Sequence, residues 1–175
     1  MKIALEGAMS TGKTTIGKLV AEKLGIPFIE EAARKALEVG FELDKGASAE
    51  AQQWILDYQK MKEVTYPEGF IADRGILSVA VYTAISNLIR KNPKKIILTY
   101  VEEELKLRKP YDKIIYFPPD VLKLEDDGVR CVDESFQKLL HEQYMNIFEN
   151  WNIPYYVINS ISIEDRVEEI CKLIN

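Results

Sequence analysis

The eight residues GAMSTGKT, at positions 7–14, constrain the fold of this chain more than any other stretch. Gly7, Gly12, Lys13 and Thr14 have the spacing of a phosphate-binding loop, in which glycines let successive backbone N–H groups curl around a phosphate. The lysine then reaches the β- and γ-phosphates of a nucleotide, and the hydroxyl is placed to bind Mg²⁺. The stretch therefore predicts a site for a nucleotide and its metal ion.

The residues around this loop fit the same interpretation. An apolar strand at residues 3–6 leads into it, and residues 15–24 continue with apolar side chains at helical spacing. We also expect Ser10, Thr11 and Thr15 to contribute to binding of the nucleotide cofactor. Strand, loop and helix thus follow one another directly, as a phosphate-binding loop requires.

Composition limits the classes of protein that need to be considered. With 175 residues, 47% of them hydrophobic, the chain is long enough for one well-packed domain, which we expect to span residues 1–175. The formal charge of −5 argues against bulk binding of nucleic acid or of a membrane surface. A single histidine excludes a site with several histidine ligands.

The chain starts directly with its first strand, and it has no apolar run near the ~18 residues of a membrane span. We therefore expect a cytoplasmic protein without a membrane partner, a monomer or a homodimer.

Strands and helices alternate along the sequence. Strands are expected at 3–6, 26–30, 70–73, 113–117 and 154–158, and helices at 15–24, 31–39, 48–65, 76–89, 94–107, 134–150 and 163–174. This alternation predicts a five-stranded parallel sheet with helices on both faces, a three-layer α/β/α fold. A polar stretch near 118–135 is expected to be a short lid. Ligands of such sheets bind beyond the carboxyl ends of the strands.

Two charged residues follow the third strand. Asp73 would face the Mg²⁺ of the phosphate-binding loop, directly or through water, and Arg74 could bind a phosphate or sugar oxygen of the substrate. The alternative for both is an ion pair at the surface.

A second charged pair follows the second strand. Glu31 could take the proton of an acceptor hydroxyl, and Arg34, one helical turn later, could hold a substrate anion. Glutamates at the start of a helix can also simply complement its dipole.

Two further residues are candidates for contact with the substrates. Arg130, in the expected lid, could stabilise the charge that builds up during phosphoryl transfer. Tyr82, with Trp54 and Tyr58, could line a pocket for a base, although packing in the core is the simpler role for any one of them.

Several of these segments resemble known families. Phe70–Arg74, followed by Ser78 and Tyr82, resembles the Asp-Arg segment of thymidylate kinases and, more loosely, the Glu-Arg segment of deoxynucleoside kinases. Glu31–Arg34 and residues 111–130 resemble a family of ATPases and kinases that includes the nicotinamide riboside kinase domains of bacterial NAD-regulator proteins. The resemblance implies a P-loop kinase fold.

The resemblance also implies roles for particular residues. Lys13 and Thr14 would act on the phosphates and Mg²⁺, Asp73 near the metal, Arg74 on the acceptor and Arg130 from the lid. Gly75 and Thr83 depart from the thymidylate kinase pattern, which usually has an aromatic residue and often a glutamine there. These departures weigh against specificity for thymidylate, although a thymidylate kinase-like acceptor stays among the expected ones beside a nicotinamide riboside kinase-like one.

The sequence as a whole predicts a kinase that uses Mg²⁺ and ATP to phosphorylate a small metabolite, a nucleoside or a nucleoside monophosphate. Lys13, Glu31, Asp73 and Arg130 are its expected catalytic residues, and residues 159–161 are expected near the adenine. A hydroxyl acceptor would give Glu31 or Asp73 a task as base, whereas a phosphate acceptor would need none. Two alternatives stay open, an ATPase or NTPase switch and a polynucleotide 5′-kinase.

Overall fold

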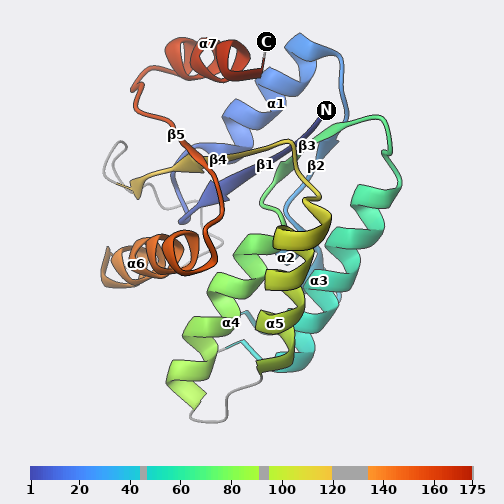
Figure 1. The fold of residues 1–175 in the computed structure, drawn as a ribbon, viewed down its shortest axis with the longest axis vertical. Coiled ribbons are helices and arrows are strands. Elements are labelled where there is room, and N and C mark those ends of the chain that lie inside the picture. Colours follow the sequence, from blue (N-terminus) through green and yellow to red (C-terminus); the bar gives the residue numbers. More distant parts are fainter. Residues whose placement is uncertain (44–46, 91–94, 120–133, 175) are drawn as a thin grey trace.

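The computed structural model describes residues 1–43, 47–90, 95–119 and 134–174 (Figure 1). Its strands are β1 (Lys2–Gly7), β2 (Phe28–Ile29), β3 (Phe70–Asp73), β4 (Lys113–Phe117) and β5 (Tyr156–Val157). Its helices are α1 (Lys13–Leu24), α2 (Ala32–Glu38), α3 (Ala49–Val64), α4 (Ile76–Arg90), α5 (Lys95–Glu103), the π-helical segment η1 (Glu104–Arg108), α6 (Glu134–Trp151) and α7 (Ile163–Ile174). None of these described helices has the length and apolar character needed to cross a membrane.

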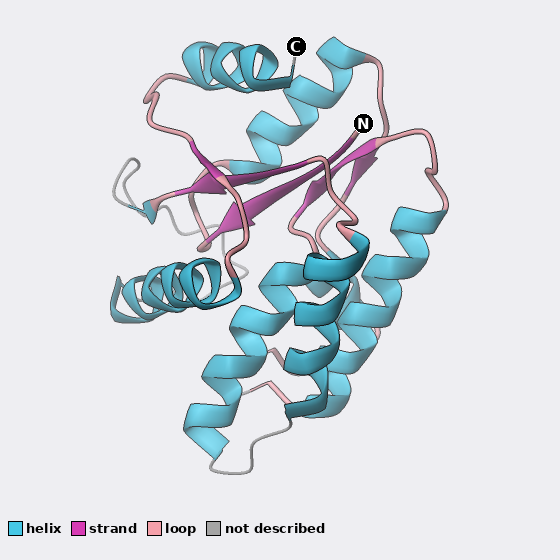
Figure 2. Cartoon of the chain, viewed as in Figure 1, coloured by secondary structure: helices cyan, strands magenta, loops and turns pink. Residues whose placement is uncertain are grey.

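The five strands form one parallel sheet in the order β2-β3-β1-β4-β5 (Figure 2). The central strand β1 ends between its two neighbours, with Leu5 in register with Asp73 of β3 and Gly7 in register with Phe117 of β4. The loop after β1 therefore begins at the middle of the carboxyl edge of the sheet, where open α/β sheets bind ligands.

Two hydrophobic cores, one on each face of the sheet, produce the three layers. Side chains such as Ala4 and Ala72 pack against α2 to α6 on one face, and Leu5 and Ile71 pack against α1 and α7 on the other. Figure 1 shows α1 and α7 together on one side of the sheet, with the remaining helices on the opposite side. The predicted fold class, a three-layer α/β/α architecture with a five-stranded parallel sheet, is confirmed, whereas the expected lid lies mostly outside the described residues.

The second strand is shorter than the predicted 26–30, and at its start the reason is the C-terminal cap of the preceding helix. Gly25, in the left-handed region at φ 67°, closes α1, and the backbone N–H of Ile26 donates to Ala21 O at 3.1 Å. Ile26 thus belongs to the helix cap rather than to the sheet. Glu31 then begins α2 as its N-cap residue.

The helix expected at 94–107 divides in two. The regular α-helix α5 ends at Glu103, and a π-helical turn continues to Arg108, after which Lys109 adopts a left-handed φ of 46°. Sequence periodicity could not separate these two geometries, because a single π-helical turn of five residues is too short to show a period of its own.

At Gly17, α1 packs closely on the sheet. A Cβ added there would lie 2.6 Å from a Phe28 ring carbon and 2.7 Å from a Leu5 methyl carbon. In an exposed helix, replacing glycine by alanine stabilises by up to about 1 kcal/mol, but overpacking a core costs about 1–3 kcal/mol.

We therefore expect Gly17→Ala to lower the free energy of unfolding by about 1–3 kcal/mol in urea titrations. Lys18→Ala, at the exposed neighbouring position, is the matched control and should change it by less than about 0.5 kcal/mol. A Gly17→Ala protein as stable as the parent would show that α1 lies further from the sheet.

Candidate functional site

The phosphate-binding loop between β1 and α1 depends on backbone conformations that glycine tolerates. Gly7 has φ 137°, and a Cβ at this position would lie 2.4 Å from the carbonyl oxygen of Phe117. Gly12 has φ 85° at the start of α1, and Ser10 adopts φ 57° between them. The loop thus curls tightly at the N-terminus of a helix, which is the geometry that binds phosphate.

Lys13 is buried and lies folded over this loop. Its Nζ donates to the carbonyl oxygen of Ala8 at 2.5 Å and to Thr11 Oγ1 at 2.9 Å. The Thr11 hydroxyl in turn donates to Ala8 O at 3.1 Å. An ammonium group is therefore held within the curl of the loop, and among the predicted loop residues only Thr15 is exposed.

Thr14 and Asp73 provide oxygens that suit Mg²⁺. Thr14 Oγ1 donates to Asp73 Oδ2 at 2.5 Å, which joins the start of α1 to the end of β3. The described residues contain no cluster of three or more His, Cys, Asp or Glu side chains that could form a complete protein metal cage. Two hard oxygen donors beside a phosphate site fit Mg²⁺, because this ion takes most of its ligands from phosphates and water.

The surroundings of Asp73 act on its protonation in opposite directions. Burial, and then the nearby Glu31 carboxylate, raise the pKa of Asp73 above its usual range, while Lys13, Thr14 and Arg74 act to lower it. A metal ion at this carboxylate would favour the charged form, so the position is electrostatically suited to a cation.

Arg74 follows β3 in the left-handed region, at φ 74°, and its side chain is buried. Its Nε forms an ion pair with Glu31 Oε1 at 2.8 Å, and its Nη1 donates to Gly7 O at 2.8 Å. The guanidinium carbon lies 5.3 Å from the centroid of the Tyr82 ring. Among the described residues Nη2 has no hydrogen-bond partner, so this donor is available to a ligand.

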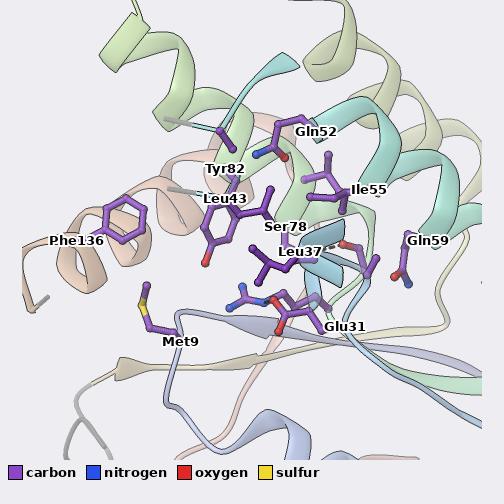
Figure 3. Close-up of a pocket in the computed structure, with 16 residues that line it drawn as sticks. Met9, Glu31, Leu37, Leu43, Gln52, Ile55, Gln59, Ser78, Tyr82 and Phe136 are labelled. Carbon is purple, nitrogen blue, oxygen red and sulfur yellow. Dashed lines mark hydrogen bonds and ion pairs between the residues drawn. The ribbon is translucent and has the colours of Figure 1, made fainter. Parts of the chain in front are cut away.

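A pocket of about 220 Å³ opens above this ion pair. Its walls are mainly apolar and come from α2, α3, α4, α6 and the phosphate-binding loop (Figure 3). The lining residues are Met9, Glu31, Ala32, Ala33, Leu37, Leu43, Ala47, Gln52, Ile55, Gln59, Arg74, Gly75, Ser78, Val79, Tyr82 and Phe136. A few polar groups in an apolar cavity are typical of small-molecule sites.

Most of the residues predicted for the site come together at the carboxyl edge of the sheet. Glu31, Arg74 and Tyr82 line the pocket, beside the Thr14–Asp73 pair and Lys13; their roles in binding and catalysis stay predictions. Arg34 forms a longer ion pair with Glu31, 3.7 Å from Nε to Oε2, with 42% of its side chain exposed, and does not line the pocket.

Two other candidates, both aromatic, do not join this group. Trp54 and Tyr58 stack on each other, with ring centroids 5.0 Å apart, and neither lines the pocket. Arg130 lies outside the described residues, so its predicted role in the lid is not addressed by the structure.

The sequence interpretation missed a buried carboxylate beneath the loop. Glu6 of β1 is fully buried; its Oε1 accepts from the Gly75 N–H at 2.9 Å and its Oε2 from the Tyr144 hydroxyl at 3.0 Å. Burial raises the pKa of Glu6 to about 7, against the lowering effects of the Gly75 N–H and of Arg74. A glutamate at the end of an otherwise apolar strand was the available signal.

The parallel sheet carries a phosphate-binding loop after its central strand, and beside this loop lies a pocket that contains a carboxylate, Glu31, and a guanidinium, Arg74. These features together are those of the class of P-loop kinases. Comparison with known proteins agrees. The model of the family described as "AAA domain" matches residues 2–166, and the chain belongs to this family.

The curated relatives are kinases. A shikimate kinase from Caldicellulosiruptor bescii is 30% identical over 161 residues, which cover 88% of this chain and 80% of the relative. A cytidylate kinase from Archaeoglobus fulgidus is 28% identical over 184 residues, which cover 99% of this chain and 94% of the relative. The chain is thus a kinase of the P-loop group that acts on nucleotides or small metabolites.

Solved structures share the fold. The NadR protein in complex with NR has a TM-score of 0.74 at 21% identity, covering 97% of this chain and 50% of that one. Deoxyadenosine kinase from M. mycoides has a TM-score of 0.71 at 19% identity, covering 100% and 99%. The resemblance to kinases of these kinds is confirmed.

The buried Glu6 makes stability depend on pH. Between the ordinary glutamate pKa of 4.5 and about 7, the folded chain holds a proton that the unfolded chain releases. The free energy of unfolding should therefore fall as pH rises through this window, by at most about 3 kcal/mol, and level off above it.

Urea titrations from pH 5 to 8 would measure this slope, which Glu6→Gln should reduce while Glu30→Gln, at an exposed carboxylate, leaves it in place. If the free energy of unfolding falls with pH equally steeply in the parent and in Glu6→Gln, the raised pKa is wrongly assigned to Glu6.

Proposed function

We propose that this protein is a Mg²⁺- and ATP-dependent kinase that phosphorylates a hydroxyl group of a nucleoside-like acceptor. The observation that carries the proposal is the pocket in which Glu31 and Arg74 lie side by side, next to the phosphate-binding loop. The relatives support phosphoryl transfer, and the pocket's chemistry supports the choice of acceptor.

The donor would bind with its phosphates in the phosphate-binding loop. Backbone N–H groups of the loop and the Lys13 ammonium would hold the β- and γ-phosphates, and Thr14 and Asp73 would hold Mg²⁺, which supplies positive charge to the transferring group. Lys13 would exchange its bonds to Ala8 and Thr11 for phosphate oxygens.

The charges of the pocket favour an unphosphorylated acceptor. Its described lining contains one cationic side chain, Arg74, and that side chain is already paired with Glu31 at 2.8 Å. An acceptor phosphate carries a charge of about −2 and would place it next to the Glu31 carboxylate. Because Arg74 is already paired with Glu31, little positive charge is left to balance that phosphate.

Glu31 is positioned to act as the base. Its carboxylate is buried, and its ion pair with Arg74 fixes the orientation of one oxygen. In the proposed step the acceptor hydroxyl oxygen bonds to the γ-phosphorus, the bond from phosphorus to the bridging oxygen of ADP breaks, and the hydroxyl proton passes to Glu31. The unpaired Nη2 of Arg74 would hold an acceptor oxygen close to this carboxylate.

The walls of the pocket favour a flat, partly apolar acceptor. Ile55, Val79 and Phe136 are apolar, and Tyr82 and the Gln52 amide also face the cavity (Figure 3). A nucleobase could pack on the apolar walls while its polar edge bonds to an amide, whereas a small polyhydroxylated acid would leave these walls unfilled.

Several features expected from the sequence remain predictions within this proposal. They are a single domain over residues 1–175, a charge-stabilising role for Arg130, substrate contacts by Arg34, a cytoplasmic location and a monomeric or homodimeric state.

The test is formation of ADP from ATP and Mg²⁺ with a panel of unphosphorylated nucleosides, nicotinamide riboside, nucleoside monophosphates and shikimate, with Lys13→Ala as the blank. We expect turnover with unphosphorylated nucleosides. Glu31→Gln should lower kcat by about 10²–10⁴-fold with little change in acceptor KM, because it removes the base and keeps the shape. Glu30→Gln, at the exposed neighbouring carboxylate, is the control and should leave kcat unchanged.

Each alternative has its own outcome. Faster turnover with monophosphates, unaffected by Glu31→Gln, would make the acceptor a phosphate. Turnover without any acceptor would favour an ATPase switch, and turnover only with oligonucleotide 5′ ends would favour a polynucleotide kinase.

A further inference from the structure

Arg166 of α7 is a buried arginine far from the acceptor pocket. Its side chain is 1% exposed, its Nη1 donates to the carbonyl oxygen of Thr11 at 2.9 Å, and its Nε donates to the carbonyl oxygen of Ser160 at 2.7 Å. Its guanidinium carbon also lies 5.8 Å from the centroid of the Phe117 ring, at the end of β4. One side chain thus joins the phosphate-binding loop to the loop between β5 and α7.

The direction of the donor nucleotide follows from the order of the strands. The acceptor pocket lies over β2 and β3, on one side of the central strand β1. In-line transfer places the attacking and leaving groups on opposite sides of the phosphorus, so the rest of the donor must extend over the ends of β4 and β5. The loop of residues 158–162, which Arg166 contacts, lies on that side.

This loop is held in shape by hydrogen bonds at both ends. The Glu169 carboxylate accepts from the backbone N–H groups of Asn159, at 3.3 Å, and Ser160, at 3.1 Å. Ser162 caps α7 by accepting from the N–H of Asp165 at 3.1 Å. Between these anchors Ile161 is 72% exposed, which leaves an apolar side chain for a flat ring to pack on.

We propose that Arg166 is a positioning residue that couples the phosphate-binding loop to the 158–162 loop, so that binding of the donor's phosphates further stabilises the contact surface for its base. The proposal rests on the proposed kinase function. Bidentate bonding by a planar guanidinium explains the residue type, since two carbonyl groups from distant loops must be held in one fixed geometry. The Glu169 carboxylate on the same helix also interacts electrostatically with Arg166, so the guanidinium and the 158–162 loop share a common anchor.

The test compares two ligands that share three phosphates, of which only one carries the adenosine group. Dissociation constants for Mg²⁺-ATP and Mg²⁺-tripolyphosphate are measured for the parent, Arg166→Met, Arg166→Lys and the control Lys172→Met, whose side chain is exposed on the same helix. Arg166→Met should weaken the binding of Mg²⁺-ATP at least tenfold. It should also reduce the ratio of the two dissociation constants at least fivefold, and it should leave the KM of the acceptor unchanged. Arg166→Lys should restore tripolyphosphate binding without restoring the advantage of ATP, because an ammonium group cannot bridge both carbonyls in the same way.

Amide hydrogen exchange of the parent protein provides a second readout that needs no variant. Mg²⁺-tripolyphosphate alone should slow exchange both in the phosphate-binding loop and at residues 159–162, although it has no base to contact the latter. An unchanged ratio of the two affinities in the variants, or slowing confined to the phosphate-binding loop, would overturn the proposal. Failure of the parent to bind either ligand would instead count against the proposed function.

Discussion

The site depends on a set of charges that are buried together at the carboxyl edge of the sheet. Glu31, Asp73, Arg74 and Lys13 are each at most 6% exposed, and Glu6 is fully buried beneath them. An isolated charge in such a place would cost several kcal/mol, so each group is tolerable only because the others and the backbone compensate it. Removing one cation would leave two or more carboxylates uncompensated, and the damage would reach the phosphate loop and the acceptor pocket together.

This interdependence also accounts for the backbone at Arg74. A left-handed φ of 74° is costly for a residue with a side chain, and the surroundings hold it in place: its N–H donates to Leu5 O at 3.0 Å, and the following N–H donates to Glu6. Gly75 can have no Cβ, because one would lie 2.6 Å from the Tyr111 hydroxyl oxygen. The glycine at position 75, where thymidylate kinases usually have an aromatic residue, is therefore required by packing in this chain.

The fold could be predicted from the sequence because its signals are local. Strand alternation, the glycine spacing and the position of Asp73 directly after an apolar strand need only a few neighbouring residues to be recognised. Glu6 and Arg166 were missed because their partners are distant: Tyr144 lies 138 positions from Glu6, and Thr11 lies 155 positions from Arg166. The ion pair between Arg74 and Glu31 could not be predicted from the sequence either. Two oppositely charged residues that follow different strands are expected to lie near each other, but the sequence does not say which group each one contacts.

The hydrogen bonds that Lys13 makes within the protein affect how a phosphate group binds to the loop and leaves it. The Lys13 ammonium bonds Ala8 O and Thr11 Oγ1 within the protein. Nucleotide binding at this position is then an exchange of partners rather than a net gain, since the phosphate must replace contacts that the protein makes within itself. When a bound phosphate group leaves, the same internal acceptors can take the ammonium back, so this buried cation has hydrogen-bond partners with and without a phosphate.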